Sequence, residues 1–270
     1  MTPCSPTTAS DGHNDPPAGF PACYTTLRHF AQWFERHGGP MLMYHKLGPR
    51  PARVRIKGLY VSSALFQRQL RELSAAGFHS VPIHELTHCH EPKPKSVVLT
   101  FDDGFENVLR YGLEPMRACG FQAIQFLVAD LLGKTNEWEQ RQGEVAERLM
   151  DEPQVREWLA AGHAIGAHTC THPRLTQIPL KEAQEEIRAS KAKLEDRFGV
   201  AIRHFCYPFG DYNQAIRDAV LSAGFDTACT TKPGLCRVDG DRLQLRRLTA
   251  RYASLKWATV GQTLRRWLRR

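Results

Sequence analysis

The feature of this sequence that most limits its fold is an alternation of short apolar runs with helical patterns. Seven runs of strand type follow one another along the chain, at residues 41–44, 78–82, 96–101, 121–128, 163–168, 203–209 and 225–229. Helical periodicity marks the segments at residues 62–76, 105–119, 154–161, 179–199, 212–223 and 254–268. This alternation is typical of β/α units that share one parallel sheet or barrel. We therefore predict a single-domain α/β fold.

The two ends of the chain differ from its centre. Positions 1–25 are rich in Pro, Ser, Thr, Asp and Gly and lack periodicity, which predicts a poorly ordered leader before a domain at 26–253. Residues 254–270 combine tryptophan and leucine with four arginines and predict a basic C-terminal helix. Such a helix either lies on anionic lipid or packs on the domain with a solvated basic face.

Composition excludes several classes of protein. Of the 270 residues, 42% are hydrophobic, which is ample for a core and excludes a disordered or fibrous chain. No window reaches about 18 apolar residues, the length that a membrane helix needs. The N-terminal segment also lacks a basic stretch followed by an apolar one. We expect neither a membrane span nor a secretory signal.

Cysteine spacing and net charge bear on location and partners. The eight cysteines form no C-x-x-C pair in a chain too large to need disulfides, which indicates reduced thiols in the cytoplasm. The formal net charge of +8 allows an anionic partner such as phospholipid or a phosphorylated sugar carrier. No nucleic-acid-binding signature accompanies this charge, so we expect no nucleic acid. We predict a cytoplasmic protein, peripheral at the inner membrane if the basic helix binds lipid.

Three polar clusters stand at or just after predicted strand ends, where the loops of parallel α/β folds converge. The first cluster is TFDDG at 100–104, in which Asp102 and Asp103 end a very apolar strand. Alternating strand geometry points the two carboxylates differently, so one can bind a cation while the other acts as a base. Asp-Asp-Gly also makes a good turn and helix start, and this alternative stays open for the motif alone.

The second cluster is HTCTH, which places His168 and His172 four residues apart. Neutral imidazole is a preferred ligand of zinc, cobalt and nickel, although this spacing also fits histidines without a metal. Cys170 lies between them as a softer candidate ligand. We favour Asp103 as the third ligand, because two histidines and a carboxylate commonly hold hydrolytic zinc with a position open for water.

The third cluster is FCYPFGD at 205–211, where a strand ends in a proline turn. Pro208 and Gly210 would fix a bend that aims the Phe209 amide at a developing oxyanion, although a merely packed turn is the alternative. Far upstream, His45 follows the apolar run MLMY and is a candidate proton donor. A lone histidine is more often a packing or hydrogen-bonding residue.

In this order, TFDDG, GHAIGAHTCTHPRLT (162–176) and FCYPFGDYN (205–213) resemble successive motifs of the polysaccharide deacetylase family, also called carbohydrate esterase family 4 or the NodB-homology group. The resemblance implies an irregular (β/α) barrel. It also implies a hydrolase that uses zinc or another divalent metal to remove acetyl groups from N-acetylated sugars. The implied partner is a glycan, either a polysaccharide or a lipid-linked precursor.

The resemblance also implies a role for each matching residue. Asp102 matches the catalytic base of the family. Asp103, His168 and His172 match its metal ligands. Phe209 matches the position whose backbone amide helps to bind the oxyanion.

Two positions depart from the usual family pattern. The arginine that orients the catalytic aspartate in the third motif is Cys206 here, and the late Leu-x-His motif that supplies the usual acid is missing from LQLRRLTARY. However, MLMYHKLG at 41–48 is similar to a segment of the branch that includes the biofilm poly-N-acetylglucosamine deacetylases, whose motif order is rearranged. That similarity implies His45 as the general acid. Separately, we expect Arg246 or Arg247 to contribute to the closing part of the site, although neither has a clear match in the family pattern.

Other readings of the site remain open. Some proteins on this scaffold hydrolyse formyl groups, cyclic imides or ureides, and a non-catalytic carbohydrate-binding member would explain Cys206 and the missing late histidine. The intact aspartates and histidines argue against a binding module. The polar stretch at 133–153 is long for a connection and predicts a loop with an extra helix or a lid.

Overall fold

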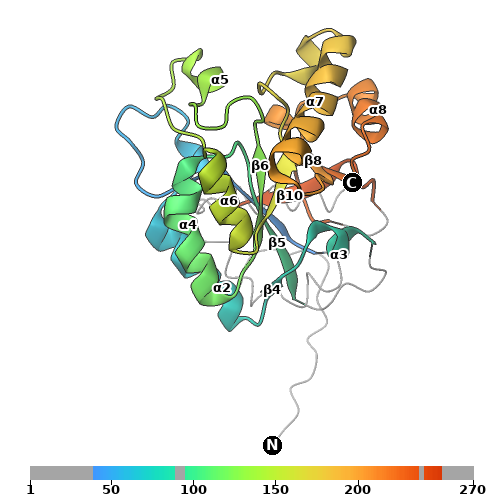
Figure 1. The fold of residues 1–270 in the computed structure, drawn as a ribbon. Coiled ribbons are helices and arrows are strands. Elements are labelled where there is room, and N and C mark those ends of the chain that lie inside the picture. Colours follow the sequence, from blue (N-terminus) through green and yellow to red (C-terminus); the bar gives the residue numbers. More distant parts are fainter. Residues whose placement is uncertain (1–38, 89–94, 237–239, 251–270) are drawn as a thin grey trace, which may run out of the picture.

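The computed structural model describes residues 39–88, 95–236 and 240–250, and its centre is a parallel sheet closed into a barrel (Figure 1). The strand order is β1-β10-β9-β8-β7-β6-β5-β4, and an additional β1–β5 pairing closes seven of these strands into a ring with β4 outside it. The strands are β1 (Met41–Tyr44), β4 (His79–Ser80), β5 (Ser96–Phe101), β6 (Ala123–Leu127), β7 (Ala164–Ala167), β8 (His204–Cys206), β9 (Thr227–Pro233) and β10 (Leu245–Thr249). The predicted single-domain (β/α) barrel is confirmed.

Helices surround this barrel, with α4 and α6 on one side and α7 and α8 on another (Figure 1). They are α2 (Ser63–Ala75), α3 (Ile83–His88), α4 (Glu106–Cys119), α5 (Glu137–Gln140), α6 (Glu152–Ala160), α7 (Leu180–Phe198) and α8 (Gln214–Ser222), with 3-10 turns η2 (Lys57–Leu59), η3 (Leu175–Gln177) and η4 (Pro208–Gly210). Local sequence sets their ends. Asp151 and Gln154 form a capping box at the start of α6, and Gly199 ends α7 with a φ of 67° that favours glycine.

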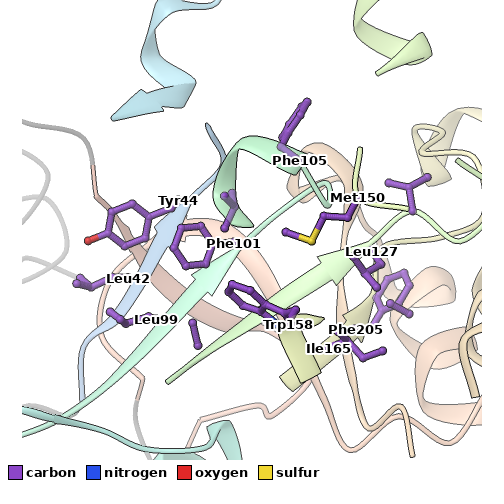
Figure 2. Packing of buried hydrophobic residues seen from close by; sticks show 14 of the residues in the cluster. Leu42, Tyr44, Leu99, Phe101, Phe105, Leu127, Met150, Trp158, Ile165 and Phe205 are labelled. Atoms are coloured by element: carbon purple, nitrogen blue, oxygen red, sulfur yellow. The ribbon is translucent and has the colours of Figure 1, made fainter. Parts of the chain in front are cut away.

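Strand β5 shows why the barrel strands are apolar throughout. All six of its residues are buried, and alternate side chains belong to different layers. Leu99 and Phe101 pack in the layer between the sheet and the helices, where Phe101 meets the Trp158 ring edge-on at 6.1 Å (Figure 2). Val98 belongs to a second cluster with Cys206 and Leu245 from across the barrel. Burial on both faces is the general property of parallel sheets covered by helices.

Several strand boundaries differ from the prediction. The predicted strand at 203–209 ends at Cys206, because Pro208 and the left-handed Phe209 (φ 59°) turn the chain into η4. The strand β10 and the short pair β2 (Lys46–Leu47) and β3 (Tyr60–Val61) were not predicted. Their sequences, LRRLT, KL and YV, are either charged or too short to give a strand pattern.

The polar stretch at 133–153 is an ordered excursion and not an open connection. It contains α5, and isolated bridges join Thr135 to Arg148 and Phe105 to Leu149 at its base. This agrees with the predicted loop carrying an extra helix. We call residues 134–150 the α5 excursion.

The predicted leader at 1–25 and the predicted basic helix at 254–270 lie outside the described residues. Of the helices that the structure does describe, none combines the length and apolar character that a membrane crossing requires. The contact of the tail with anionic lipid stays a prediction.

Candidate active site

Three residues from the first two clusters converge at the carboxyl ends of β5 and β7. The Nε2 atoms of His168 and His172 lie 3.2 and 3.3 Å from Oδ1 of Asp103. All three side chains are buried, and their candidate ligand atoms lie within 4.8 Å of one another. The structure therefore brings together the carboxylate and the two imidazoles that the motifs singled out.

This donor set fits a divalent transition metal such as zinc. Two imidazole nitrogens and one carboxylate oxygen are ligands that zinc accepts, and three protein ligands leave a position open for water. His168 has the second hydrogen bond common to ligating histidines, since its Nδ1 lies 2.7 Å from the carbonyl oxygen of Cys206. Cys170 is not part of the cluster found among the described residues, and its Sγ instead lies 3.7 Å from Nζ of Lys193.

Two of these residues have a left-handed backbone. The φ angles of Asp103 and His172 are 74° and 64°, and each costs on the order of 1–3 kcal/mol in a residue other than glycine. The amide of His172 donates to Oγ1 of Thr169 at 3.0 Å, which helps to fix this turn. Backbone strain of this kind gathers at functional sites, where the surrounding structure holds the chain in an otherwise unfavourable shape.

Charge and burial compete in setting the pKa values of the cluster. Burial alone would raise the pKa of Asp103, but hydrogen bonds from His168 and His172 bring it well below its ordinary value. Burial lowers the pKa of His172 to about 4. The ionised carboxylate of Asp103 and the neutral imidazole of His172 are the forms that bind a metal. Burial lowers the pKa of His168, but its interactions with Cys206 and Asp103 raise it well above its ordinary value, so a metal would displace its proton.

Asp102, next to the cluster, forms a two-pronged ion pair with Arg247. Nη1 and Nη2 of Arg247 donate to Oδ1 and Oδ2 of Asp102 at 2.7 and 2.8 Å, and both side chains are almost fully buried. Burial raises the pKa of Asp102, but the charge of Arg247 outweighs it and the pKa falls below its ordinary value. Asp102 is thus an ionised carboxylate held in one orientation.

Arg247 compensates for the cysteine at position 206. Its side chain starts on β10, donates through Nε to the carbonyl of Thr230 at 2.9 Å, and brings Nη2 within 3.2 Å of Sγ of Cys206. Nη1 also donates to Oγ1 of Thr100 at 2.9 Å. The guanidinium that the family pattern places on the third motif therefore comes from another strand and reaches the same aspartate.

The sequence around Arg247 has the period-2 alternation of a strand, although a charged residue occupies one of the inward positions. Leu243, Leu245 and Arg247 alternate on the buried side, whereas Arg246 is exposed. A strand prediction over LQLRRLT would have selected Arg247 from the two candidates.

The remaining candidates, His45 and Phe209, contact different members of the site. Nε2 of His45 is 3.7 Å from Oδ2 of Asp102, and 17% of the His45 side chain is exposed. The Phe209 ring meets the His172 ring edge-on at 4.6 Å, beneath the guanidinium of Arg174. The roles of His45 as acid and of the Phe209 amide as oxyanion donor stay predictions.

Sequence reasoning missed two groups contributed by the α5 excursion. Trp138 stacks on the His172 ring at a centroid distance of 4.2 Å, and Glu139 accepts a hydrogen bond at 2.7 Å from the buried Nζ of Lys46. Only the polar length of 133–153 and its lone tryptophan hinted at a role.

The fold and the site together are those of a closed parallel (β/α) barrel with a candidate metal site, the buried Asp-His-His cluster, at one end. The model of the polysaccharide deacetylase family matches residues 89–228, just over half of the chain. The chain belongs to the polysaccharide deacetylase family.

Individual relatives agree with this assignment. YxkH of Bacillus subtilis (strain 168) is 25% identical over 213 residues, covering 77% of this chain and 70% of that protein. The peptidoglycan-N-acetylglucosamine deacetylase PgdA of Listeria monocytogenes is 23% identical over 64% of this chain, which spans only 32% of PgdA. The solved structure of the Streptococcus pyogenes deacetylase PplD in complex with acetate shares the fold, with a TM-score of 0.69, 22% identity and coverage of 84% of this chain and 97% of PplD.

Proposed function

We propose that this protein is a zinc-dependent deacetylase that removes acetyl groups from N-acetylated sugars of a polysaccharide or lipid-linked glycan precursor. One observation carries the proposal: the buried cluster of Asp103, His168 and His172 stands beside an ionised Asp102 held by Arg247. Membership of the family and the names of PgdA and PplD support a deacetylation of this kind. A cytoplasmic location remains a proposal that rests on the cysteine pattern.

Each residue of the site has one task in this reaction. Asp103, His168 and His172 would hold a zinc ion, which would supply acidification of a bound water and polarisation of the acetyl carbonyl. Asp102 accepts the proton of the attacking water, and Arg247 keeps its carboxylate ionised and correctly turned. His45 donates a proton to the departing sugar amine. The Phe209 amide stabilises the negative oxygen of the tetrahedral intermediate.

The experiment that tests the proposal measures acetate release and metal content together. Purified protein is incubated with N-acetylglucosamine oligomers and other acetylated glycans, with zinc, cobalt or a chelator, and with formylated sugars and cyclic imides as competing substrates. We expect acetate from an N-acetylated glycan, loss of activity after chelation, and recovery with zinc. The variant Asp103→Asn should lose both metal and activity, whereas Asp196→Asn on the exposed face of α7 should lose neither.

Two results would contradict the proposal in different ways. Full acetate release by protein shown to be metal-free would mean that the reaction does not need a metal. Protein that binds zinc at the cluster but releases no acetate from any glycan would remove the deacetylase activity, and hydrolysis of a formyl or imide substrate would then identify the alternative.

A further inference from the structure

The two histidines of the cluster are supported in different ways. Nδ1 of His168 is hydrogen-bonded to the Cys206 carbonyl, which fixes the ring with Nε2 toward Asp103. Nδ1 of His172 is buried and has no hydrogen-bond partner among the described residues. Because ligating histidines usually direct their second nitrogen to an oxygen, something else must fix the orientation of the His172 ring.

Aromatic rings surround His172 in place of that hydrogen bond. The indole of Trp138 stacks on the imidazole at 4.2 Å with 25° between the planes. The Phe209 and His168 rings meet it edge-on, at 4.6 and 4.8 Å. Rotation of the imidazole about its Cβ–Cγ bond would drive its edge into the indole face, so the stack restricts the ring to the orientation that directs Nε2 at Asp103.

Trp138 can do this because α5 is itself held in place. The carboxylate of Glu139, the next residue, accepts hydrogen bonds from Lys46 at 2.7 Å and from Asn136 at 2.6 Å. The ammonium of Lys46 also lies 4.3 Å from the centre of the Phe105 ring. Lys46 directly follows His45 in the chain, so the contact ties the excursion to the segment that carries the candidate acid.

A second stacked pair in the molecule provides a comparison. Trp158 stacks on His163 at 4.2 Å and 29°, nearly the same geometry, but Nδ1 of His163 accepts a hydrogen bond from the Ala123 amide. His163 is outside the Asp-His-His cluster. Nδ1 of His163 thus has a hydrogen bond in addition to the stack, whereas Nδ1 of His172 has only the packed rings around it.

We propose that Trp138 is a positioning residue that holds the His172 imidazole ready to bind the metal. This inference rests on the proposed function, since it presupposes that His172 is a metal ligand. Without the stacked ring the His172 imidazole is free to rotate. Metal binding must then also fix this ring, and the lost rotational entropy lowers the affinity. Loss of support around a metal ligand typically weakens affinity by about 10- to 100-fold.

The test measures zinc affinity by competition with a chromophoric chelator, on proteins whose folding is checked by circular dichroism. Trp138→Leu removes the flat ring and should weaken zinc binding by roughly 10-fold or more. Trp138→Phe keeps a flat ring and should recover most of the affinity. Trp158→Leu removes the ring of the matched stack on a histidine outside the cluster and should leave zinc affinity unchanged. If Trp138→Leu does not fold, Trp138→Met offers a flexible apolar side chain for the same measurement.

The outcomes separate this inference from the proposed function. Wild-type zinc affinity in folded Trp138→Leu or Trp138→Met overturns the positioning role while the deacetylase proposal stands. Equal weakening in Trp158→Leu also overturns it, because the effect would then be one of general stability. Wild-type protein that binds no zinc overturns the proposed function itself.

Discussion

The two halves of the active site are built by different means. Asp102 stands at the end of a barrel strand and is held by charge, through a buried guanidinium from β10 that contacts both of its oxygens. His172 stands in a loop and is held by packing, through an indole from the α5 excursion. The candidate base is thus positioned by the barrel itself, whereas one candidate metal ligand packs against a segment outside the barrel.

The α5 excursion has its own attachment to the rest of the molecule. Three of its acids face the segment around β2 and β3: Glu139 meets Lys46, Glu144 accepts from the amides of Arg55 and Ile56, and Glu147 accepts from the hydroxyl of Tyr60. These contacts are polar, whereas the contact that the excursion makes with His172 is aromatic. Variants of the polar contacts therefore test how the excursion is attached, whereas variants of Trp138 test its effect on His172.

The largest effect should come from breaking the buried ion pair between Arg247 and Asp102. Arg247→Met leaves the buried Asp102 carboxylate without its partner and should lower the free energy of unfolding by about 3–5 kcal/mol, with loss of activity. The double variant Asp102→Asn with Arg247→Met should recover much of the stability but none of the activity. Denaturant unfolding and acetate release measure the two effects.

Arg246→Met is the matched control, because this neighbouring arginine on β10 is exposed. It should change neither stability nor activity. If Arg247→Met were as stable and active as Arg246→Met, the charge-based account of Asp102 would be wrong.

A smaller effect is expected from a change of His45, which lies beside Asp102. His45→Ala should lower kcat by roughly 100-fold, the usual contribution of a general acid, while zinc content stays at the wild-type level. His84→Ala changes an exposed histidine on α3 and should have no effect. Wild-type turnover in His45→Ala would mean that a group other than His45 acts as the general acid.

The smallest effect should follow from loosening the attachment of the excursion. Lys46→Met removes the ion pair with Glu139 and should destabilise the protein by about 1–3 kcal/mol, the cost of a buried acceptor left without its donor. Glu139 keeps the hydrogen bond from Asn136, which limits the loss. Zinc affinity should fall less than in Trp138→Leu, because the indole remains.

Lys57→Met on the exposed face of η2 is the control for Lys46→Met. Equal unfolding free energies for these two variants would mean that the buried pair does not hold the excursion.

The prediction from sequence was accurate where one strand or helix carries its own signal. The apolar run at 96–101 became β5 without a change of boundary, and the helix at 179–199 was placed within a residue at each end. Prediction failed where the pattern depends on a distant partner. Strand β10 was missed because Arg247 looks like a surface residue until Asp102, 145 positions earlier in the chain, neutralises it.

The sequence by itself determined an alternating α/β fold with a parallel sheet or barrel, because apolar periodicity is a local property. Strand-end chemistry, also local, singled out the motif residues, and the resemblance of the motifs to a known family favoured the barrel. Only the tertiary structure decided that an arginine of β10 pairs with Asp102 and that Trp138 lies against His172. Both contacts join segments far apart in the chain. The partners of a buried charge or ring are fixed by the geometry of barrel closure, and no local pattern encodes that geometry.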